Sequence, residues 1–162
     1  MGLFKRKSKQ VIGLDISSTS VKMVELSLNS QGYHVESFAV KALSKGSVVE
    51  KNINDVDAVA ETIRQLVAQT KPKSKDAAVA VAGSAVITKV INMPEGLSDD
   101  ALESQITIEA DQYIPFPLDE VAIDFEVLGQ EDENSGQMQV LLAACRRENI
   151  ELRPEVLEWA GL

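Results

Sequence analysis

The chain has 162 residues, of which 44% are apolar, and it carries a formal net charge of −9 at pH 7. This composition is typical of one globular domain or of two small subdomains that share a core. The acidic balance argues against a general nucleic-acid binder, because phosphate backbones require a positive stripe. With one cysteine, Cys145, and one histidine, His34, the chain has no intramolecular disulfide and no sign of a zinc cluster or a Cys-His pair.

The first nine residues include Lys5, Arg6, Lys7 and Lys9 and form a basic leader that we expect to be disordered. The apolar segment behind them is interrupted by Asp15, which makes a poor signal peptide. The longest apolar run is too short to span a bilayer. The sequence therefore predicts a cytoplasmic protein.

Three strand candidates follow in succession, at Val11 to Ile16, Val21 to Leu28 and Tyr33 to Leu43. Short turns join them, the first rich in Ser and Thr and the second containing Gly32. This pattern predicts an antiparallel meander.

The first of these turns carries a group of polar residues that suits phosphate. They are Asp15, Ser17, Ser18, Thr19, Ser20 and Lys22. Hydroxyls and successive backbone N–H groups in a tight turn form a concave donor surface for an anion, and Lys22 adds a positive charge. Asp15 would act on Mg²⁺ indirectly, by holding a hydrated ion that bridges to the phosphates. The same residue types are also common in ordinary hairpin turns, where they hydrogen-bond their own backbone.

A helix is predicted from about Asp55 to Thr70, with Asn54 or Asp55 as its cap and Lys71-Pro72 as its stop. A buried strand, Ala77 to Ala82, comes next. Three strands, a helix and a strand open a ribonuclease-H-like or actin-like α/β domain. A plain α+β sandwich fits the same pattern.

From Ser84 the pattern becomes strand, helix, strand, strand. Val86 to Met93 is the first strand, and Ser98 caps a helix with Leu102, Ile106, Ala110 and Tyr113 on one face. The run Ile114-Pro115-Phe116-Pro117 stops this helix, because prolines remove backbone donors.

The second half of this pattern is a hairpin followed by a helix. The strand Val121 to Leu128 alternates apolar and polar residues, Gly129 to Gly136 is an acidic loop, and Met138 to Cys145 returns. Cys145 is expected to be a small buried hydrophobe. The last helix spans roughly Glu148 to Leu162. Pro154 is tolerable only in a first turn, so its start is expected nearer Leu152.

Three segments together resemble the PilM family, actin-like proteins of the type IV pilus assembly machinery that are similar to the cell-division protein FtsA. They are Gly13 to Lys22, Ala78 to Gly83 and, above all, Glu109 to Val121 with its Tyr-Ile-Pro-Phe-Pro run. The resemblance covers nearly the whole chain. It implies an actin-like α/β fold in which residues 10–83 begin subdomain 1A, residues 84–145 form an inserted subdomain 1C, and residues 146–162 return to 1A.

The resemblance also implies a function. A full-length member would bind ATP and Mg²⁺ through the hairpin from Asp15 to Lys22, and it would capture the cytoplasmic tail of the membrane protein PilN in a groove where 1A meets 1C. Tyr113, Ile114 and Phe116 are the predicted lining, although they also suit packing of 1C onto 1A. The protein would lie at the cytoplasmic face of the inner membrane through its partners, with other pilus assembly proteins among them, and no residue pattern indicates catalysis.

Two departures from the family limit what carries over. Ser17 stands where many actin-superfamily loops have glycine, so the backbone would approach phosphate less closely. The family also continues for about as much chain again, so we expect weak ATP binding here and self-association through an uncovered apolar face. An ATPase or sugar-kinase-like enzyme and an FtsA-like filament-forming membrane tether remain the alternatives.

Overall fold

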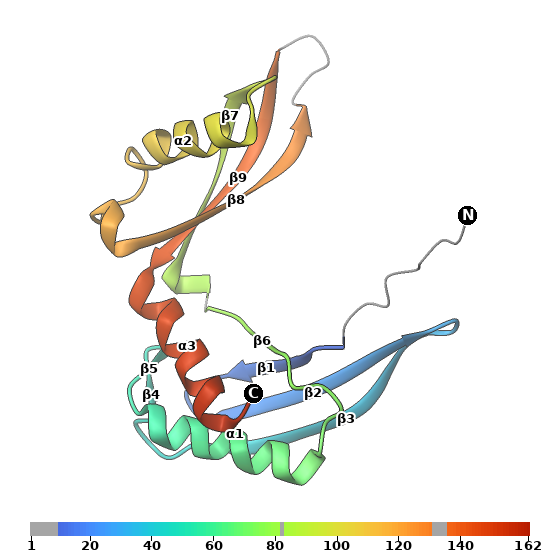
Figure 1. The fold of residues 1–162 in the computed structure, drawn as a ribbon. Coiled ribbons are helices and arrows are strands. Elements are labelled where there is room, and N and C mark those ends of the chain that lie inside the picture. Colours follow the sequence, from blue (N-terminus) through green and yellow to red (C-terminus); the bar gives the residue numbers. More distant parts are fainter. Residues whose placement is uncertain (1–9, 82, 131–135) are drawn as a thin grey trace. The chain divides into compact units, whose positions relative to one another are not determined.

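The computed structural model describes residues 10–81, 83–130 and 136–162. The chain forms two compact units (Figure 1). The first contains the described residues up to Ala80 together with Leu152–Leu162, and the second is Val81–Glu151. Each unit contains a sheet and its own hydrophobic core. The chain is therefore a mixed α/β protein. The predicted leader at residues 1–9, Ala82 and the middle of the predicted acidic loop, residues 131–135, lie outside the described residues.

The first unit is built on the predicted meander. Its strands are β1 (Ile12–Ile16), β2 (Ser20–Asn29), β3 (Gly32–Ala42) and β6 (Ala77–Val79), in the sheet order β3-β2-β1-β6. The β1–β2 and β2–β3 pairs are antiparallel, which confirms the meander, and β6 runs parallel to β1.

Helix α1 (Val56–Thr70) covers one face of this sheet (Figure 1). Asp55 caps it as predicted, because its carboxylate accepts a hydrogen bond from the backbone N–H of Ala58 at 2.9 Å. The helix ends at Lys71, whose φ of 47° is left-handed. Ile63 and Leu66 are fully buried in the core that the helix makes with the sheet.

A small hairpin between β3 and α1 was not predicted. It consists of β4 (Val48–Val49) and β5 (Asn52–Ile53), and its turn residues Glu50 and Lys51 both have positive φ. Val48 and Ile53 are buried in the core of the first unit. Strands of two residues are too short to show the period-2 alternation on which a sequence prediction depends.

The strand β6 is shorter and more exposed than predicted. It spans three residues rather than Ala77 to Ala82, and Ala78 is exposed. The prediction of a buried strand was wrong because, among the described residues, β6 lies at the edge of the sheet and pairs with β1 alone. A hydrogen bond fixes the chain just after β6. The buried Arg153 donates it from Nε to the Ala80 carbonyl oxygen at 3.1 Å.

A buried carboxylate positions the segment that leads into β6. Glu25 is 1% exposed, and its Oε1 accepts hydrogen bonds from the backbone N–H groups of Lys73 at 3.0 Å and Ser74 at 2.9 Å. Its Oε2 lies 3.2 Å from the same Lys73 nitrogen. Buried carboxylates need such partners, because an unpaired buried charge is strongly unfavourable.

The second unit follows the predicted order strand, helix, strand, strand. Its elements are β7 (Val86–Pro94), α2 (Asp99–Ala110), β8 (Val121–Gln130) and β9 (Gln137–Arg146), with short 3₁₀ turns η1 (Gly83–Ala85) and η2 (Leu118–Glu120). The sheet order is β7-β9-β8, and both pairs are antiparallel. Helix α2 packs Leu102, Ile106 and Ala110 against this sheet, and Ser98 caps it as predicted.

The last helix differs from its prediction. Helix α3 (Arg147–Ala160) begins directly after β9, so Pro154 lies inside it and not in its first turn. A proline within a helix removes the hydrogen bond to the carbonyl four residues earlier, at Ile150, which costs about 3 kcal/mol. Val156 and Ala160, later in the same helix, are buried in the core of the first unit, and this packing offsets the cost.

Candidate functional site

The turn between β1 and β2 is closed by its own serines. The backbone N–H of Ser17 donates to the carbonyl oxygen of Ser20 at 3.0 Å, and the Ser17 hydroxyl donates to the same oxygen at 2.8 Å. The backbone N–H of Ser20 in turn donates to Ser17 Oγ at 3.2 Å, and the two hydroxyl oxygens lie 3.3 Å apart. These two predicted phosphate ligands therefore hold the turn closed.

The tip of the turn presents the donors that an anion would need. The side chains of Ser18 and Thr19 are exposed, and their backbone N–H groups donate no hydrogen bond to any described residue. The tip is fixed in place, because the carbonyl oxygen of Thr19 accepts a hydrogen bond from the N–H of Leu43 at 2.9 Å. Successive unpaired backbone amides beside hydroxyls form an anion-accepting surface.

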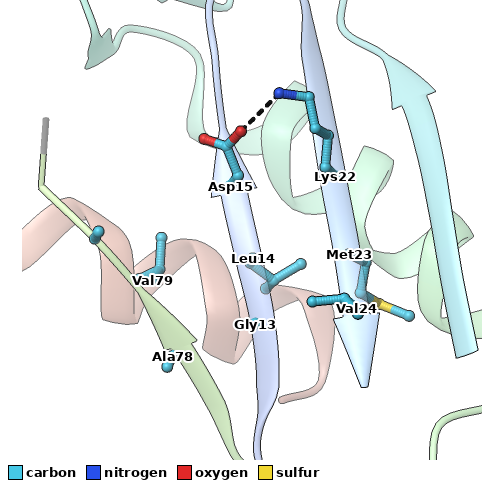
Figure 2. A pocket seen from close by; sticks show the side chains of 9 residues that line it. Gly13, Leu14, Asp15, Lys22, Met23, Val24, Ala78 and Val79 are labelled. Atoms are coloured by element: carbon cyan, nitrogen blue, oxygen red, sulfur yellow. Dashed lines mark hydrogen bonds and ion pairs between the residues drawn. The ribbon is translucent and has the colours of Figure 1, made fainter. Parts of the chain in front are cut away.

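Asp15 and Lys22 form an ion pair next to this turn. They are direct cross-strand partners, and Lys22 Nζ lies 2.8 Å from Asp15 Oδ2 (Figure 2). Their side chains are 63% and 56% exposed, respectively. An exposed pair of this kind contributes about 0 to 1 kcal/mol, so a phosphate group or a hydrated cation can compete for either partner.

A hollow of about 440 Å³ lies beside the ion pair, over β1, β2 and β6 (Figure 2). It is lined by Gly13, Leu14, Asp15, Lys22, Met23, Val24, Ala78, Val79 and Ala80. Gly13 leaves room for the Val24 side chain, because a Cβ atom at this position would lie only 3.3 Å from Val24 Cγ1. Apart from the ion pair the lining is apolar, which suits hydrocarbon surface better than phosphate.

A second hollow, of about 500 Å³, lies at the tip of the turn. It is lined by Ser18, Thr19, Leu43, Lys45, Gly46, Val48, Val49 and Glu50. Sequence reasoning missed Lys45, the cation of this hollow, because the unpredicted β4–β5 hairpin supplies the wall that faces it. The sequence signal that could have indicated Lys45 is the glycine after it, because glycine is common where the chain turns. Gly46 does adopt a positive φ, of 87°.

The structure thus divides the six predicted phosphate-site residues among three places. Asp15 and Lys22 line the first hollow, Ser18 and Thr19 line the second, and Ser17 and Ser20 close the turn between them. No group of three or more His, Cys, Asp or Glu side chains that could hold a metal ion occurs in residues 10–81, 83–130 and 136–162.

The predicted partner-binding residues lie in the second unit, between α2 and η2. Ile114 is 6% exposed and belongs to the core of that unit, so it anchors the segment. Tyr113 is 38% exposed, and Lys89 Nζ lies 5.2 Å from the centre of its ring. Phe116 is half-buried, with the guanidinium carbon of Arg146 4.5 Å from its ring centre. Each accessible ring therefore carries a cation over its face.

Among the described residues, no helix combines the length and the apolar character needed to cross a membrane.

Comparisons with known proteins match this arrangement. The family model described as type IV pilus assembly protein PilM matches residues 13–162. A solved structure described as a PilM-PilN type IV pilus biogenesis complex contains a chain with 30% sequence identity to this one and a TM-score of 0.83. The match covers 94% of this chain and 45% of that chain. This chain therefore spans less than half the length of the solved chain it resembles.

Proposed function

The chain belongs to the PilM family of type IV pilus assembly proteins, and we propose that it binds the short cytoplasmic tail of PilN at the inner-membrane assembly platform. One observation carries the proposal: the similar chain, aligned over 94% of this one at a TM-score of 0.83, comes from a PilM-PilN complex. The likeness in fold and sequence supports the same association by analogy, and the residues of the site must carry it.

The surface around Tyr113 supports this choice of partner. Aromatic side chains are enriched in protein interfaces, and Tyr113 and Phe116 are the accessible rings of the predicted segment. Ile114 anchors the backbone between them, which lowers the entropy that the rings lose on binding. The strand β8 begins just after this segment and lies at an edge of its sheet, where free backbone groups can pair with an extended peptide.

We further propose that the first unit corresponds to actin-like subdomain 1A, the second unit to subdomain 1C, and the β1–β2 hairpin to a nucleotide site. In a protein of the length of the matched chain, Ser18 and Thr19 would meet the phosphates, and Asp15 would hold Mg²⁺ through water. In this chain alone we expect weak ATP binding. The role is that of a nucleotide-binding scaffold at the cytoplasmic face of the membrane, not that of an enzyme.

Calorimetric titration of the chain with a synthetic PilN cytoplasmic tail, with and without Mg-ATP, tests the proposal. We expect saturable binding that is the same in both conditions. Tyr113→Ala should weaken it about tenfold or more, because truncation of an interface tyrosine commonly costs over 1 kcal/mol. Ile108→Ala, at a 70%-exposed position on α2, is the matched control and should bind as the wild type does.

The proposal fails if a chain with native circular dichroism does not bind the tail at all. Equal affinities of the Tyr113→Ala and Ile108→Ala variants would still support PilN as the partner but would place its binding site outside the predicted segment.

A further inference from the structure

Three lysines occupy alternate positions in the loop that joins α1 to β6 (Figure 1). Lys71, Lys73 and Lys75 are exposed, and the residues between them are half-buried. Neighbouring lysines of this set are two residues apart, so their Cα atoms lie within about 7 Å of each other. The loop therefore turns its positive side chains toward the solvent as one row, which we call the lysine row.

The backbone of the lysine row is fixed by hydrogen bonds to the rest of the first unit. The N–H of Lys71 donates to the Val67 carbonyl oxygen at 2.8 Å. The buried Glu25 carboxylate accepts hydrogen bonds from the N–H groups of Lys73 and Ser74. A surface that is ordered before binding loses less entropy when a partner arrives.

Two lysines of the row are available to an outside charge. Lys73 Nζ is taken up by its ion pair with Glu36. Lys71 and Lys75 form no ion pair with any residue in 10–81, 83–130 and 136–162. Of the acidic residues that the loop contacts or contains, Glu25 is 1% exposed and Asp76 is half-buried. The charge that the loop exposes to solvent is therefore positive.

The start of the described chain is tied to this loop. The Ser74 hydroxyl donates a hydrogen bond to the carbonyl oxygen of Gln10 at 2.7 Å. In the sequence, Gln10 follows a basic stretch, and a chain spans at most about 3.5 Å per residue. Covalent connection alone thus keeps the nearest of these charges within reach of the lysine row. The basic residues are Lys5, Arg6, Lys7 and Lys9.

The two units differ in the sign of their charge. The first unit has 13 basic and 10 acidic residues, whereas the second has 3 basic and 15 acidic residues. The net charge of −9 therefore comes from the second unit. An anionic surface attracts the first unit and repels the second.

The chemistry of the row favours lipid headgroups over nucleic acid. Lysine presents a compact charge and lacks the planar fork with which arginine binds phosphates and bases bidentately. Residues 71–76 also contain no aromatic ring on which a base could stack. In the basic stretch, Leu3 and Phe4 directly precede Lys5. Basic residues beside apolar ones are typical of segments that lie on an anionic membrane surface.

We propose that the lysine row is a direct contact site for the anionic headgroups of a membrane. Lys71 and Lys75 pair with lipid phosphates, Lys73 stays with Glu36, and the basic residues before Gln10 add to the attraction. This inference goes beyond the proposed function, in which PilN connects the chain to the membrane. The contact requires neither PilN nor a nucleotide.

Co-sedimentation of the chain with lipid vesicles tests this inference. Vesicles of phosphatidylglycerol and phosphatidylcholine in equal parts should bind the wild type, whereas vesicles of phosphatidylcholine alone should not. The double variant Lys71→Gln with Lys75→Gln should bind the anionic vesicles about 25-fold more weakly, because each basic residue near such a surface contributes about fivefold in affinity. Circular dichroism confirms that each variant is folded.

The double variant Lys41→Gln with Lys51→Gln is the matched control. It removes the same charge from the same unit, but Lys41 lies at the end of β3 that pairs with the start of β2, and Lys51 lies in the turn between β4 and β5. We expect it to bind within about twofold of the wild type, because a distant charge is largely screened. About 0.5 M NaCl should release the wild type from the vesicles for the same reason.

Three results would overturn the proposal. One is a folded wild type that does not bind the anionic vesicles or binds both kinds equally. Another is an equal loss in the two double variants, which would assign the attraction to the overall charge of the first unit. The third is tighter binding to a single-stranded oligonucleotide than to the anionic vesicles, which would assign the row to nucleic acid. PilN is absent from all these measurements, so this proposal and the proposed function can fail separately.

Discussion

The two units share one packing arrangement and differ in the face of the sheet that lies away from the helix. In each, helix covers one face of an antiparallel or mixed sheet. In the first unit the opposite face carries exposed apolar pairs of β2 and β3, such as Leu28 with Tyr33, whereas in the second exposed Thr88, Asn92, Asp124 and Glu126 flank the apolar Val90 and Leu141. An antiparallel sheet with one polar face is stable in water. The comparison shows that the second sheet carries polar side chains on its outer face, whereas the outer face of β2 and β3 is mostly apolar.

The units also use aromatic rings differently. In the second unit, Tyr113 and Phe116 each have a cation over the ring, which keeps an accessible ring partly polar. In the first unit, Tyr33 and Phe38 are more exposed and lie among aliphatic side chains. The former arrangement suits a site that binds and releases a peptide, whereas the latter exposes apolar surface of the kind that marks an interaction site.

The largest effect should come from cavities in the separate cores. Ile63→Ala in α1 and Leu142→Ala in β9 each remove a fully buried side chain, and each should cost about 2 to 5 kcal/mol. Hydrogen exchange followed by mass spectrometry reports protection in both units at once. We expect each variant to lose protection mainly in its own unit, since the two residues lie in separate clusters. Equal loss in both units from either variant would show one shared core.

The buried Glu25 should matter next. Glu25→Gln keeps the shape and can keep its oxygen between the N–H groups of Lys73 and Ser74, but its N–H₂ then replaces Oε2, 3.2 Å from the Lys73 nitrogen, where two donors oppose each other. We expect a loss of about 1 to 3 kcal/mol in the free energy of unfolding by urea. Glu126→Gln, at an exposed position in the other unit, is the matched control and should change stability by less than about 0.5 kcal/mol. Similar losses in both variants would mean that the Glu25 hydrogen bonds contribute little.

A smaller effect should follow from removing the cation over Phe116. Arg146→Gln loses the ring contact, which is about 0.5 to 1 kcal/mol at an exposed site, and Arg146 is 44% exposed. Arg146→Lys should retain most of that stability, because it keeps the charge. If urea denaturation gives the same midpoint for Arg146→Gln and the wild type, the cation contributes only to solubility.

The smallest effect should be a pH dependence in the first unit. The hydrogen bond from Lys73 Nζ, at 2.5 Å, and then that from the Ser27 hydroxyl lower the pKa of Glu36 below its ordinary value of 4.5. The unfolded chain then binds a proton that the folded chain does not, so this stability is present above pH 4.5 and is lost as the pH falls through the lowered pKa.

Lys73, the partner of Glu36, sets the alkaline limit of the stability that this ion pair contributes. The hydrogen bond that Lys73 Nζ donates to the Glu36 carboxylate raises the pKa of Lys73 above 10.5, so its contribution is present below that pH and is lost as the pH rises through the raised pKa. Thermal unfolding of Glu36→Gln against the wild type between about pH 3 and 7 checks the acidic limb. An equally steep acid loss in both proteins would assign it to other carboxylates.

Much of the fold could be predicted because its signals are local. The alternation of β8, the Asp55 cap of α1 and the meander are encoded within a few residues, and the structure confirms them. The short β4 and β5 strands and the internal Pro154 of α3 depend on packing against the core, which no local pattern contains. Tertiary contacts decided these elements.

The candidate site was predictable in composition but not in geometry. The polar character of the β1–β2 turn follows from its residues, yet the sequence does not show that Ser17 and Ser20 would bond to each other. The β-bulge at Glu36 was likewise missed, because a one-residue insertion in a strand has no distinct composition. That single residue decides which apolar side chains of β3 share one face of the sheet.

The most direct test of the assignment of partner binding to the second unit is a nitrogen-15 NMR titration of the labelled chain with the PilN cytoplasmic tail. The account predicts that amide shifts change around Tyr113 and Ile114 and near Lys89 and Arg146, while those of Ser18 and Thr19 do not move. Shifts confined to the β1–β2 turn or to β2 and β3, with the second unit unchanged, would contradict it.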